Sequence, residues 1–405
     1  MTDAGAKRDS SRDESYGWVV VGALSVTVTV SYGVLTYAFG VLLVPMERDL
    51  GWSRIELTGA FSLALAVWAV AGVAVGIALD RFSPRVIMAG GSLLGTVLVL
   101  AWAEVQTPAQ LYIVFAGIGV AMAAVQYNAV FAVATKWFRS RRRTALTAIT
   151  LVGAFSSFIF SPLTGTLTAE LGWRQALVVL AVVLGAITIP LHAGVLRRAP
   201  HAAAGAAERV TADVRHLVTS APFWFLAVAL ALGSYVWSVM VVQLVPFLVD
   251  SGHSLTFGAL AAGVVGLGQL PGRLVYVFSG ERLGGVRLPA TTFGFSMSAL
   301  TLLAVNRSEP AVLVFAAVFG MSSGMLTLMS ASLPADLFGR HAYGTVSGVI
   351  YAFSNGARAI APFASAATVL LPGGYTTLLG SLIGLSVLAA LLGFLALGGR
   401  TAPSG

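Results

Sequence analysis

The chain has 405 residues, of which 57% are hydrophobic and only 10% are charged, and its mean hydropathy is +0.88. Because soluble globular domains carry about 25% charged residues, this composition excludes a soluble protein and predicts an integral membrane protein. The net charge of +8 does not indicate nucleic-acid binding, since most cations lie in short loops between apolar runs. The chain has no cysteine and its five histidines show no metal-ligand spacing, so we expect no disulfide, metal or cofactor.

Twelve apolar runs follow one another along the chain, and a helix needs about 20 such residues to cross a bilayer. The sequence therefore predicts an all-α membrane fold with twelve transmembrane helices. We expect these helices at residues 16–44, 54–79, 85–104, 109–135, 144–169, 175–196, 222–249, 255–279, 288–305, 310–335, 343–371 and 375–397.

The charges of the loops predict the orientation of the chain. With both termini on the cytoplasmic side, 18 of the 24 cations lie on that side and 4 on the other, as the positive-inside rule requires. We therefore expect both termini in the cytoplasm and the protein in the inner (plasma) membrane. Every Asp and Glu lies in a tail, in a loop or at the end of a span, whereas Arg273 and Arg358 fall within spans.

The chain also repeats itself at a shift of about 201 residues. The stretch "LVPMERDLGWS" at 43–53 matches "LVPFLVDSGHS" at 244–254, and Asp80-Arg81 corresponds to Glu281-Arg282. We therefore expect two six-helix halves, duplicated in parallel. The expected domains are a cytoplasmic tail at 1–15, a first half at 16–196, a cytoplasmic linker at 197–220, a second half at 221–398 and a C-terminal tail at 399–405.

This duplication resembles the major facilitator superfamily over essentially the whole chain. The loop "GIALDRFSPR" at 76–85 is similar to the superfamily motif G-x-x-x-D-R-x-G-x-R/K, with Ser83 in place of the usual glycine. The resemblance implies a gating latch in which Asp80 pairs with basic residues of the adjoining loop, involving Arg81, Arg85 and their counterparts Glu281 and Arg282. The alternative is that Arg81 and Arg85 serve only the topology.

Two segments resemble the monocarboxylate-porter group more narrowly. The stretch "KWFRSRRRTALTAITLVGAFSS" at 136–157 is similar to the start of that group's fifth span, and "YGWVVV" at 16–21 to its first-span entry. The alternative for the charges at 139–143 is a plain positive-inside cluster.

Arg273 lies in the apolar stretch "GQLPGRLVYVF" at 268–278 of the eighth span. A guanidinium group stays charged and can bind a carboxylate through two parallel hydrogen bonds. Gln269, Arg273 and Tyr276 follow at i, i+4 and i+7 and form one polar stripe, which favours substrate contact. The alternative is that Arg273 snorkels to cytoplasmic water. Monocarboxylate porters and the related oxalate/formate exchangers resemble this chain in having an arginine in the eighth span.

Arg358 lies deeper within its span, where Ser347, Tyr351, Asn355 and Arg358 share one face of the eleventh helix. The oxalate/formate exchangers are similar in having a basic residue in this span, although theirs is typically lysine. We interpret Arg358, Asn355 and Tyr351 as substrate contacts. The alternative is that Arg358 bonds to backbone carbonyls near Pro362.

Smaller polar side chains within the spans are further candidates for substrate contact. They are Thr29 and Tyr32 in the first span, Gln126, Tyr127 and Asn128 in the fourth, and Gln243 in the seventh. The alternative for each of them is helix packing.

Two cations and no carboxylate at membrane depth predict an anionic substrate. The resemblance implies proton-coupled transport of a monocarboxylate similar to lactate or pyruvate, by alternating access of the two halves. Arginine does not release its proton, and Gln269 stands where monocarboxylate porters usually have an acid, so the proton carrier stays open. The options are cotransport of the protonated acid or use of Asp49, Asp250 or His253.

The second hypothesis is exchange of small mono- or dicarboxylates, because two cations suit two carboxylates. Multidrug efflux is disfavoured, since the fourth span lacks the arginine typical of drug/proton antiporters.

We expect no enzyme, because the spans hold no nucleophile–base pair or metal set. The expected partners are a small carboxylate, protons and the lipid bilayer, with no nucleic acid, and we expect the protein to function as a monomer.

Overall fold

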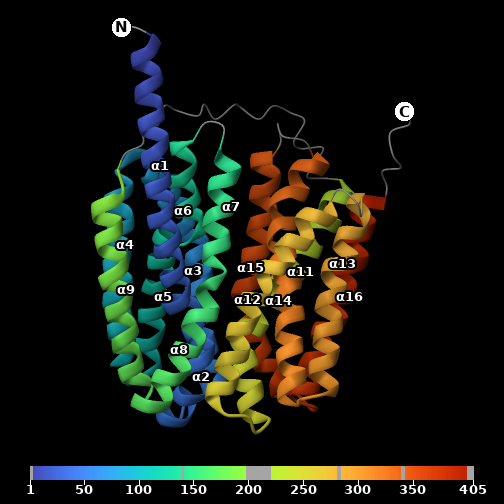
Figure 1. Cartoon of the computed structure of the whole chain (residues 1–405). Helices are drawn as coiled ribbons and strands as arrows, with labels where there is room; N and C mark the ends of the chain where they lie inside the picture. Colours follow the sequence, from blue (N-terminus) through green and yellow to red (C-terminus); the bar gives the residue numbers. More distant parts are fainter. Residues whose placement is uncertain (1–2, 139–140, 198–219, 281–283, 339–342, 399–405) are drawn as a thin grey trace. The chain divides into compact units, whose positions relative to one another are not determined.

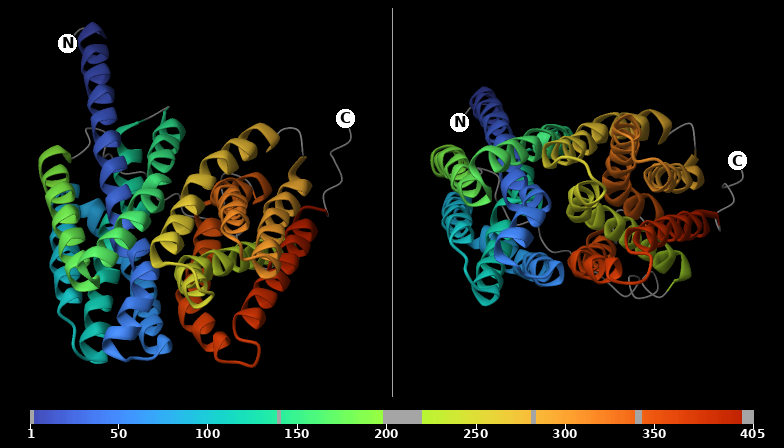
Figure 2. Two further views of the ribbon diagram at one scale, coloured as in Figure 1. Left: turned by 60° about the horizontal axis from the view of Figure 1, so that its bottom comes forward. Right: turned by 90° about the horizontal axis from the view of Figure 1, so that it is seen from below.

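The computed structural model describes residues 3–138, 141–197, 220–280, 284–338 and 343–398 (Figure 1). Within these ranges every regular element is a helix. The chain divides into two compact units, residues 1–205 and 206–405. In both views of Figure 2 the helices of each unit, blue to green in the first and yellow to red in the second, lie alongside one another as a bundle. The expected linker at 197–220 stays a prediction, because 198–219 lies outside the described residues.

The first unit contains six spans, three of which are interrupted. Its elements are α1 (Asp3–Tyr32), η1 (Gly33–Tyr37), α2 (Ala38–Leu50), α3 (Arg54–Arg81), α4 (Pro84–Ala103), α5 (Pro108–Val125), α6 (Tyr127–Ala134), η2 (Thr135–Trp137), α7 (Arg142–Gly153), α8 (Phe155–Leu171) and α9 (Trp173–Val195). The first span contains the π-helix η1, the fourth breaks at Gln126 and the fifth breaks at Ala154. Helix α1 also begins earlier than the expected span, because its polar first turns continue beyond the apolar run.

In its described residues, the second unit has six helices without such breaks. They are α11 (Ala221–Asp250), α12 (Leu255–Gly280), α13 (Gly284–Val305), α14 (Glu309–Phe338), α15 (Tyr343–Val369) and α16 (Tyr375–Gly398). Eleven of the spans in the described residues are long and apolar enough to cross a membrane. Helix α15 is not among these eleven, and it carries Arg358, Asn355 and many small residues. The twelve-helix fold expected from the sequence is nevertheless confirmed.

Helix starts on the side expected to face outward are set by local side-chain chemistry. Ser53 accepts a hydrogen bond from the backbone N–H of Glu56, whose carboxylate in turn accepts one from the backbone of Ser53. Thr107 and Gln110 form the same capping box before α5. These reciprocal bonds satisfy N–H groups that have no partner inside a helix. Each helix therefore begins at a defined residue.

Each unit contains an equivalent contact of its own, and the two positions fit the internal repeat. In the first unit, the carboxylate of Asp49 accepts a hydrogen bond from the indole N–H of Trp173 at 2.9 Å. In the second unit, Asp250 accepts one from the Tyr375 hydroxyl, also at 2.9 Å. Asp49 and Asp250 are 201 residues apart, and each joins the end of its unit's first span to the start of its sixth. The duplication visible in the sequence is thus also present in the packing.

Within each unit, helices that are distant in sequence pack together. Helices α3 and α5 lie against each other in the first unit, as do α4 and α9. Stacked and edge-on rings of Phe39, Phe61, Trp102 and Phe115 fill part of the first unit's core. In the second unit the main pairs are α12 with α14, α11 with α15, and α13 with α16. These pairs determine which side chains can meet Arg273 and Arg358.

Candidate functional site

Arg273 lies inside the second unit, on α12. Its side chain is only 5% exposed, and its Nη2 donates a hydrogen bond to Oε1 of Gln269 at 3.2 Å. Gln269 is one turn earlier on the same helix and is 7% exposed. Seven residues separate Arg273 from the end of α12, which corresponds to about 10 Å of helix. A neutral amide therefore orients a guanidinium group well inside the bundle.

The position of this pair is fixed by an unusually close crossing of α12 and α14. Glycines recur at four-residue spacing on both helices, at Gly268 and Gly272 on α12 and at Gly320 and Gly324 on α14. A Cβ at Gly272 would lie 2.7 Å from the Cα of Met321, and a Cβ at Gly324 would lie 2.9 Å from the Cα of Gln269. Small residues in this pattern let two membrane helices touch through their backbones. Gln269 and Arg273 therefore project from a backbone that has no room to shift toward α14.

Tyr276 continues the polar stripe of α12 by one further turn. Its side chain is partly buried, and its hydroxyl is hydrogen-bonded to the Ser332 hydroxyl on α14. Of the three residues in the stripe, Gln269 and Arg273 contact each other, whereas the hydroxyl of Tyr276 contacts the neighbouring helix. The stripe expected from the i, i+4, i+7 spacing thus has two local environments.

Arg358 belongs to a different helix pair of the same unit. It lies fifteen residues after the start of α15 and eleven before its end, and its side chain is partly buried. Its guanidinium carbon lies 5.1 Å from the ring centroid of Trp237 on α11. Its backbone carbonyl accepts a hydrogen bond from the Ser238 hydroxyl at 3.0 Å. Two successive residues of α11 therefore contact Arg358, one at its side chain and one at its backbone.

The other candidates on α11 and α15 have diverse surroundings. Asn355 is partly buried and Tyr351 is 43% exposed. Gln243 is 1% exposed, and its Nε2 donates to the Ser365 hydroxyl at 3.1 Å, which joins α11 to α15. Gln243 therefore has a structural contact in this arrangement, and its role toward a substrate stays a prediction.

In the first unit, the candidates gather where three helices are irregular. Gln126 has an extended backbone (φ −92°, ψ −174°) between α5 and α6, and its Nε2 donates to Thr36 in the π-helix η1 at 3.0 Å. Beside this break, the rings of Tyr32 and Tyr127 lie 4.8 Å apart. Non-helical backbone at membrane depth occurs where protein buries it or where it lines a cavity. The sequence did not predict these interruptions.

The third irregularity, at the break between α7 and α8, lies against the same cluster. The Thr29 hydroxyl donates to the carbonyl of Val152 at 3.2 Å, and the Ser156 hydroxyl donates to the carbonyl of Thr29 at 2.7 Å. A Cβ at Gly153 would collide with the Tyr127 hydroxyl. Asn128, by contrast, is exposed on α6. The structure thus brings Thr29, Gln126, Tyr127 and Tyr32 together, with Asn128 beside them.

The gating candidates lie at the end of α3 and the start of α4. The Asp80 carboxylate accepts a hydrogen bond from Nζ of Lys136 at 2.8 Å, and Lys136 also donates to the carbonyl of Leu79. Arg85 donates to the carbonyl of Leu196 at 3.1 Å, and Arg81 is exposed. Lys136 comes from the segment after the fourth span, and the sequence did not predict it as a partner of Asp80. Glu281 and Arg282 lie outside the described residues.

His192 is a buried polar residue of the first unit whose contacts the sequence did not predict. It is fully buried on α9, with Nδ1 2.7 Å from the Ser92 hydroxyl of α4 and Nε2 3.0 Å from the Thr27 hydroxyl of α1. The imidazole therefore joins three helices of the first unit. A signal was available, because an ionisable residue within a predicted span is rare and marks an internal contact.

These features can be compared with known proteins. The profile of the Major Facilitator Superfamily matches residues 24–362. The chain belongs to the Major Facilitator Superfamily. It is 27% identical to monocarboxylate transporter 13 of Rattus norvegicus over 82% of this chain and 77% of that one. It is 24% identical to the uncharacterized MFS-type transporter YcxA of Bacillus subtilis, over 88% of this chain and 90% of that one.

Solved structures agree on the fold. The inward-facing, unoccupied crystal structure of a bacterial homolog to the human lysosomal transporter Spinster superposes with a TM-score of 0.77 at 15% identity, over 96% of this chain and 99% of that one. At this identity the likeness shows the fold alone. The resemblance to monocarboxylate transporters read from the sequence is therefore confirmed by the relatives, and the chain is a multi-pass membrane transporter of this superfamily.

Proposed function

We propose that this protein is a secondary transporter of small organic anions that recognises a carboxylate through Arg273. The supporting observation is a guanidinium group that is 5% exposed inside α12 and oriented by the amide of Gln269. Inserting an arginine into a membrane helix costs about 3 kcal/mol on insertion scales, so a buried one indicates a functional role. Guanidinium is also the side chain best suited to bind a carboxylate through two hydrogen bonds.

A monocarboxylate similar to lactate or pyruvate is the first choice of substrate. This choice rests on the relative named monocarboxylate transporter 13, which matches most of the chain. We further propose that transport proceeds by alternating access and that the protein works as a monomer. The positive-inside distribution of its cations supports a plasma-membrane location with both termini in the cytoplasm.

Coupling to protons is the less supported part of this proposal. Neither α12 nor α15 contains an Asp or Glu, and arginine keeps its proton. A proton would then enter with the substrate as the neutral acid, or through a group elsewhere in the chain. Exchange of one carboxylate for another is the second candidate function, and the presence of two arginines within the spans of one unit favours it.

Counterflow in proteoliposomes tests the proposal. Liposomes loaded with an unlabelled acid should accumulate the labelled acid, and Arg273→Gln should abolish the uptake while the purified protein keeps its melting temperature. Arg287→Gln, which removes an exposed arginine on α13, serves as the matched control and should transport normally. Transport that survives Arg273→Gln, or a wild type that moves only lipophilic cations, would refute carboxylate recognition at this residue.

The same preparation separates the two coupling modes. Proton symport predicts that an imposed pH gradient drives net uptake into empty liposomes. Exchange predicts no net uptake without an internal carboxylate, whatever the pH gradient. Lactate, pyruvate, acetate and oxalate, each tested in both formats, would rank the substrates.

A further inference from the structure

The second arginine, Arg358, lies near the middle of α15, about 22 Å of helix from its start and about 17 Å from its end. A long side chain at this depth has many rotamers, and a binding site needs one of them to be held. The residues that contact Arg358 on α11 therefore decide how its donors are presented.

The indole of Trp237 contacts the guanidinium group. The 5.1 Å separation between the guanidinium carbon and the indole centroid is within the range of a cation–π contact. The five N–H donors of arginine lie in the guanidinium plane, so a contact with an aromatic ring leaves them able to bind a carboxylate. Lysine, which has no planar group to place against a ring, would not use this contact in the same way.

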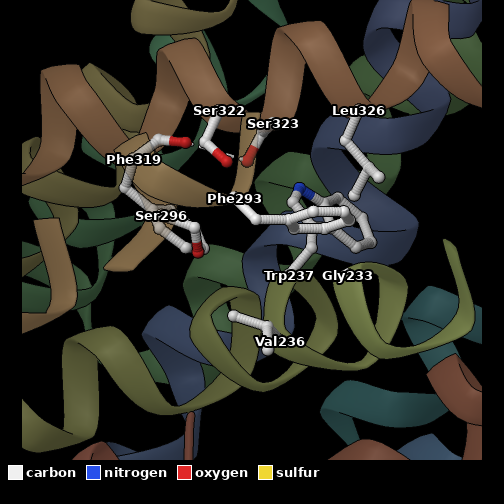
Figure 3. A pocket seen from close by; sticks show the side chains of 9 residues that line it. All are labelled: Gly233, Val236, Trp237, Phe293, Ser296, Phe319, Ser322, Ser323 and Leu326. Carbon is white, nitrogen blue, oxygen red and sulfur yellow. Dashed lines mark hydrogen bonds between the residues drawn. The ribbon is translucent and has the colours of Figure 1, made fainter. Parts of the chain in front are cut away.

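The indole is itself held by its surroundings. Figure 3 shows Trp237 among the residues that line a small pocket between α11, α13 and α14, with Phe293, Leu326 and three serines around it. The pocket has room for about one water molecule. A Cβ at Gly233 would lie 2.7 Å from the Phe293 ring, so Phe293 packs directly against the backbone of α11 one turn before Trp237. The indole is therefore partly buried among these side chains.

The residue that follows Trp237 fixes the backbone of the arginine. Ser238 donates its hydroxyl hydrogen to the carbonyl of Arg358 at 3.0 Å. This bond sets the register of α15 against α11 at the same residue whose side chain meets the indole. The side chain and the backbone of Arg358 thus each contact one of two consecutive residues of α11.

We propose that Trp237 is a positioning residue, which holds the Arg358 guanidinium for a substrate carboxylate. This inference rests on the proposed function, because it concerns how the second arginine of the same transporter is presented. Trp237→Leu removes the aromatic face, and the KM for a small carboxylate should rise about 5-fold with the maximum rate largely unchanged. Trp237→Phe keeps a weaker ring and should give a smaller rise.

The matched control is Trp224→Leu, the same substitution on the same helix. Trp224 is 38% exposed and its ring meets Phe353, not Arg358. This variant should leave the KM at the wild-type value. An equal KM for Trp237→Leu and the wild type would overturn the positioning role, as would an equal rise in both leucine variants.

Tryptophan emission tests the contact without any transport. Arg358→Gln should change the emission spectrum in the wild-type background, and it should change nothing in the Trp237→Phe background. Identical changes in the two backgrounds would overturn the inference even if carboxylates are transported. If the wild type moves no carboxylate, the proposed function fails, and the emission pair alone then supports or overturns the contact between Trp237 and Arg358.

Discussion

Replacing Gly272 with alanine tests how firmly the crossing of α12 and α14 holds the Arg273 site. The added Cβ would lie 2.7 Å from both the Cα and the carbonyl carbon of Met321, whereas ordinary contacts begin at 3.4 Å. The carbonyl oxygen of Met321 would lie closer still, so the two backbones must separate by at least about 0.7 Å at this point, the difference between these distances. Overpacking of this kind costs about 1–3 kcal/mol, because neither partner atom belongs to a flexible side chain.

The expected result is a lower melting temperature in detergent together with weaker carboxylate transport. A loss of 1–3 kcal/mol corresponds to about 2–12 °C for a unit of this size. Transport should weaken because Arg273 is the next residue on the displaced backbone. Thermal unfolding followed by fluorescence gives the first quantity, and counterflow in proteoliposomes gives the second.

Two glycines of the same unit provide matched controls. A Cβ at Gly294 on α13 or at Gly356 on α15 would meet nothing within 4 Å. Alanine at either position should leave the melting temperature unchanged or raise it slightly, since alanine lowers the entropy of the unfolded chain. If Gly272→Ala has the same melting temperature as Gly294→Ala, the crossing is looser than the structure shows and the reasoning fails.

Three further substitutions test individual contacts. Lys136→Ala should change the stability by no more than about 1 kcal/mol, because its ion pair with Asp80 is partly exposed, but it should slow counterflow if the pair acts as a latch. His192→Leu should cost about 1–3 kcal/mol in thermal unfolding, since it leaves two buried hydroxyls without their imidazole partner. Ser53→Ala should lower the free energy of unfolding by about 1 kcal/mol because it removes the capping box, and an unchanged thermal stability would contradict this.

The positions of the spans could be predicted from the sequence because long apolar runs have few other solutions. The eighth span was expected at 255–279 and the structure has α12 at Leu255–Gly280. The interruptions could not be predicted in this way. Neither the extended backbone at Gln126 nor the π-helix at Gly33–Tyr37 contains a proline. The Gln126 side chain donates a hydrogen bond to Thr36 in this π-helix, 90 residues earlier in the chain, and no local pattern indicates such a contact.

The site was predictable to the extent that its contacts are local. Gln269 and Arg273 are four residues apart on one helix, and this spacing alone placed them on one face. The partners of Asp80 and Arg358 come from segments 56 and 121 residues away in the chain. No single-sequence pattern indicates such pairs, so the contacts of Lys136 with Asp80 and of Trp237 with Arg358 became visible only in the fold.

The two arginines of the second unit are held by different physical means. The amide of Gln269 accepts a hydrogen bond from Arg273, and the indole of Trp237 meets the guanidinium group of Arg358. Both partners are uncharged, so these contacts orient a cation without cancelling its charge. Arg273 moves with the α12–α14 crossing, whereas Arg358 is tied to α11. Substitutions at the glycine crossing should therefore affect Arg273 more than Arg358. The contributions of the two arginines to anion binding are thus separable by mutation.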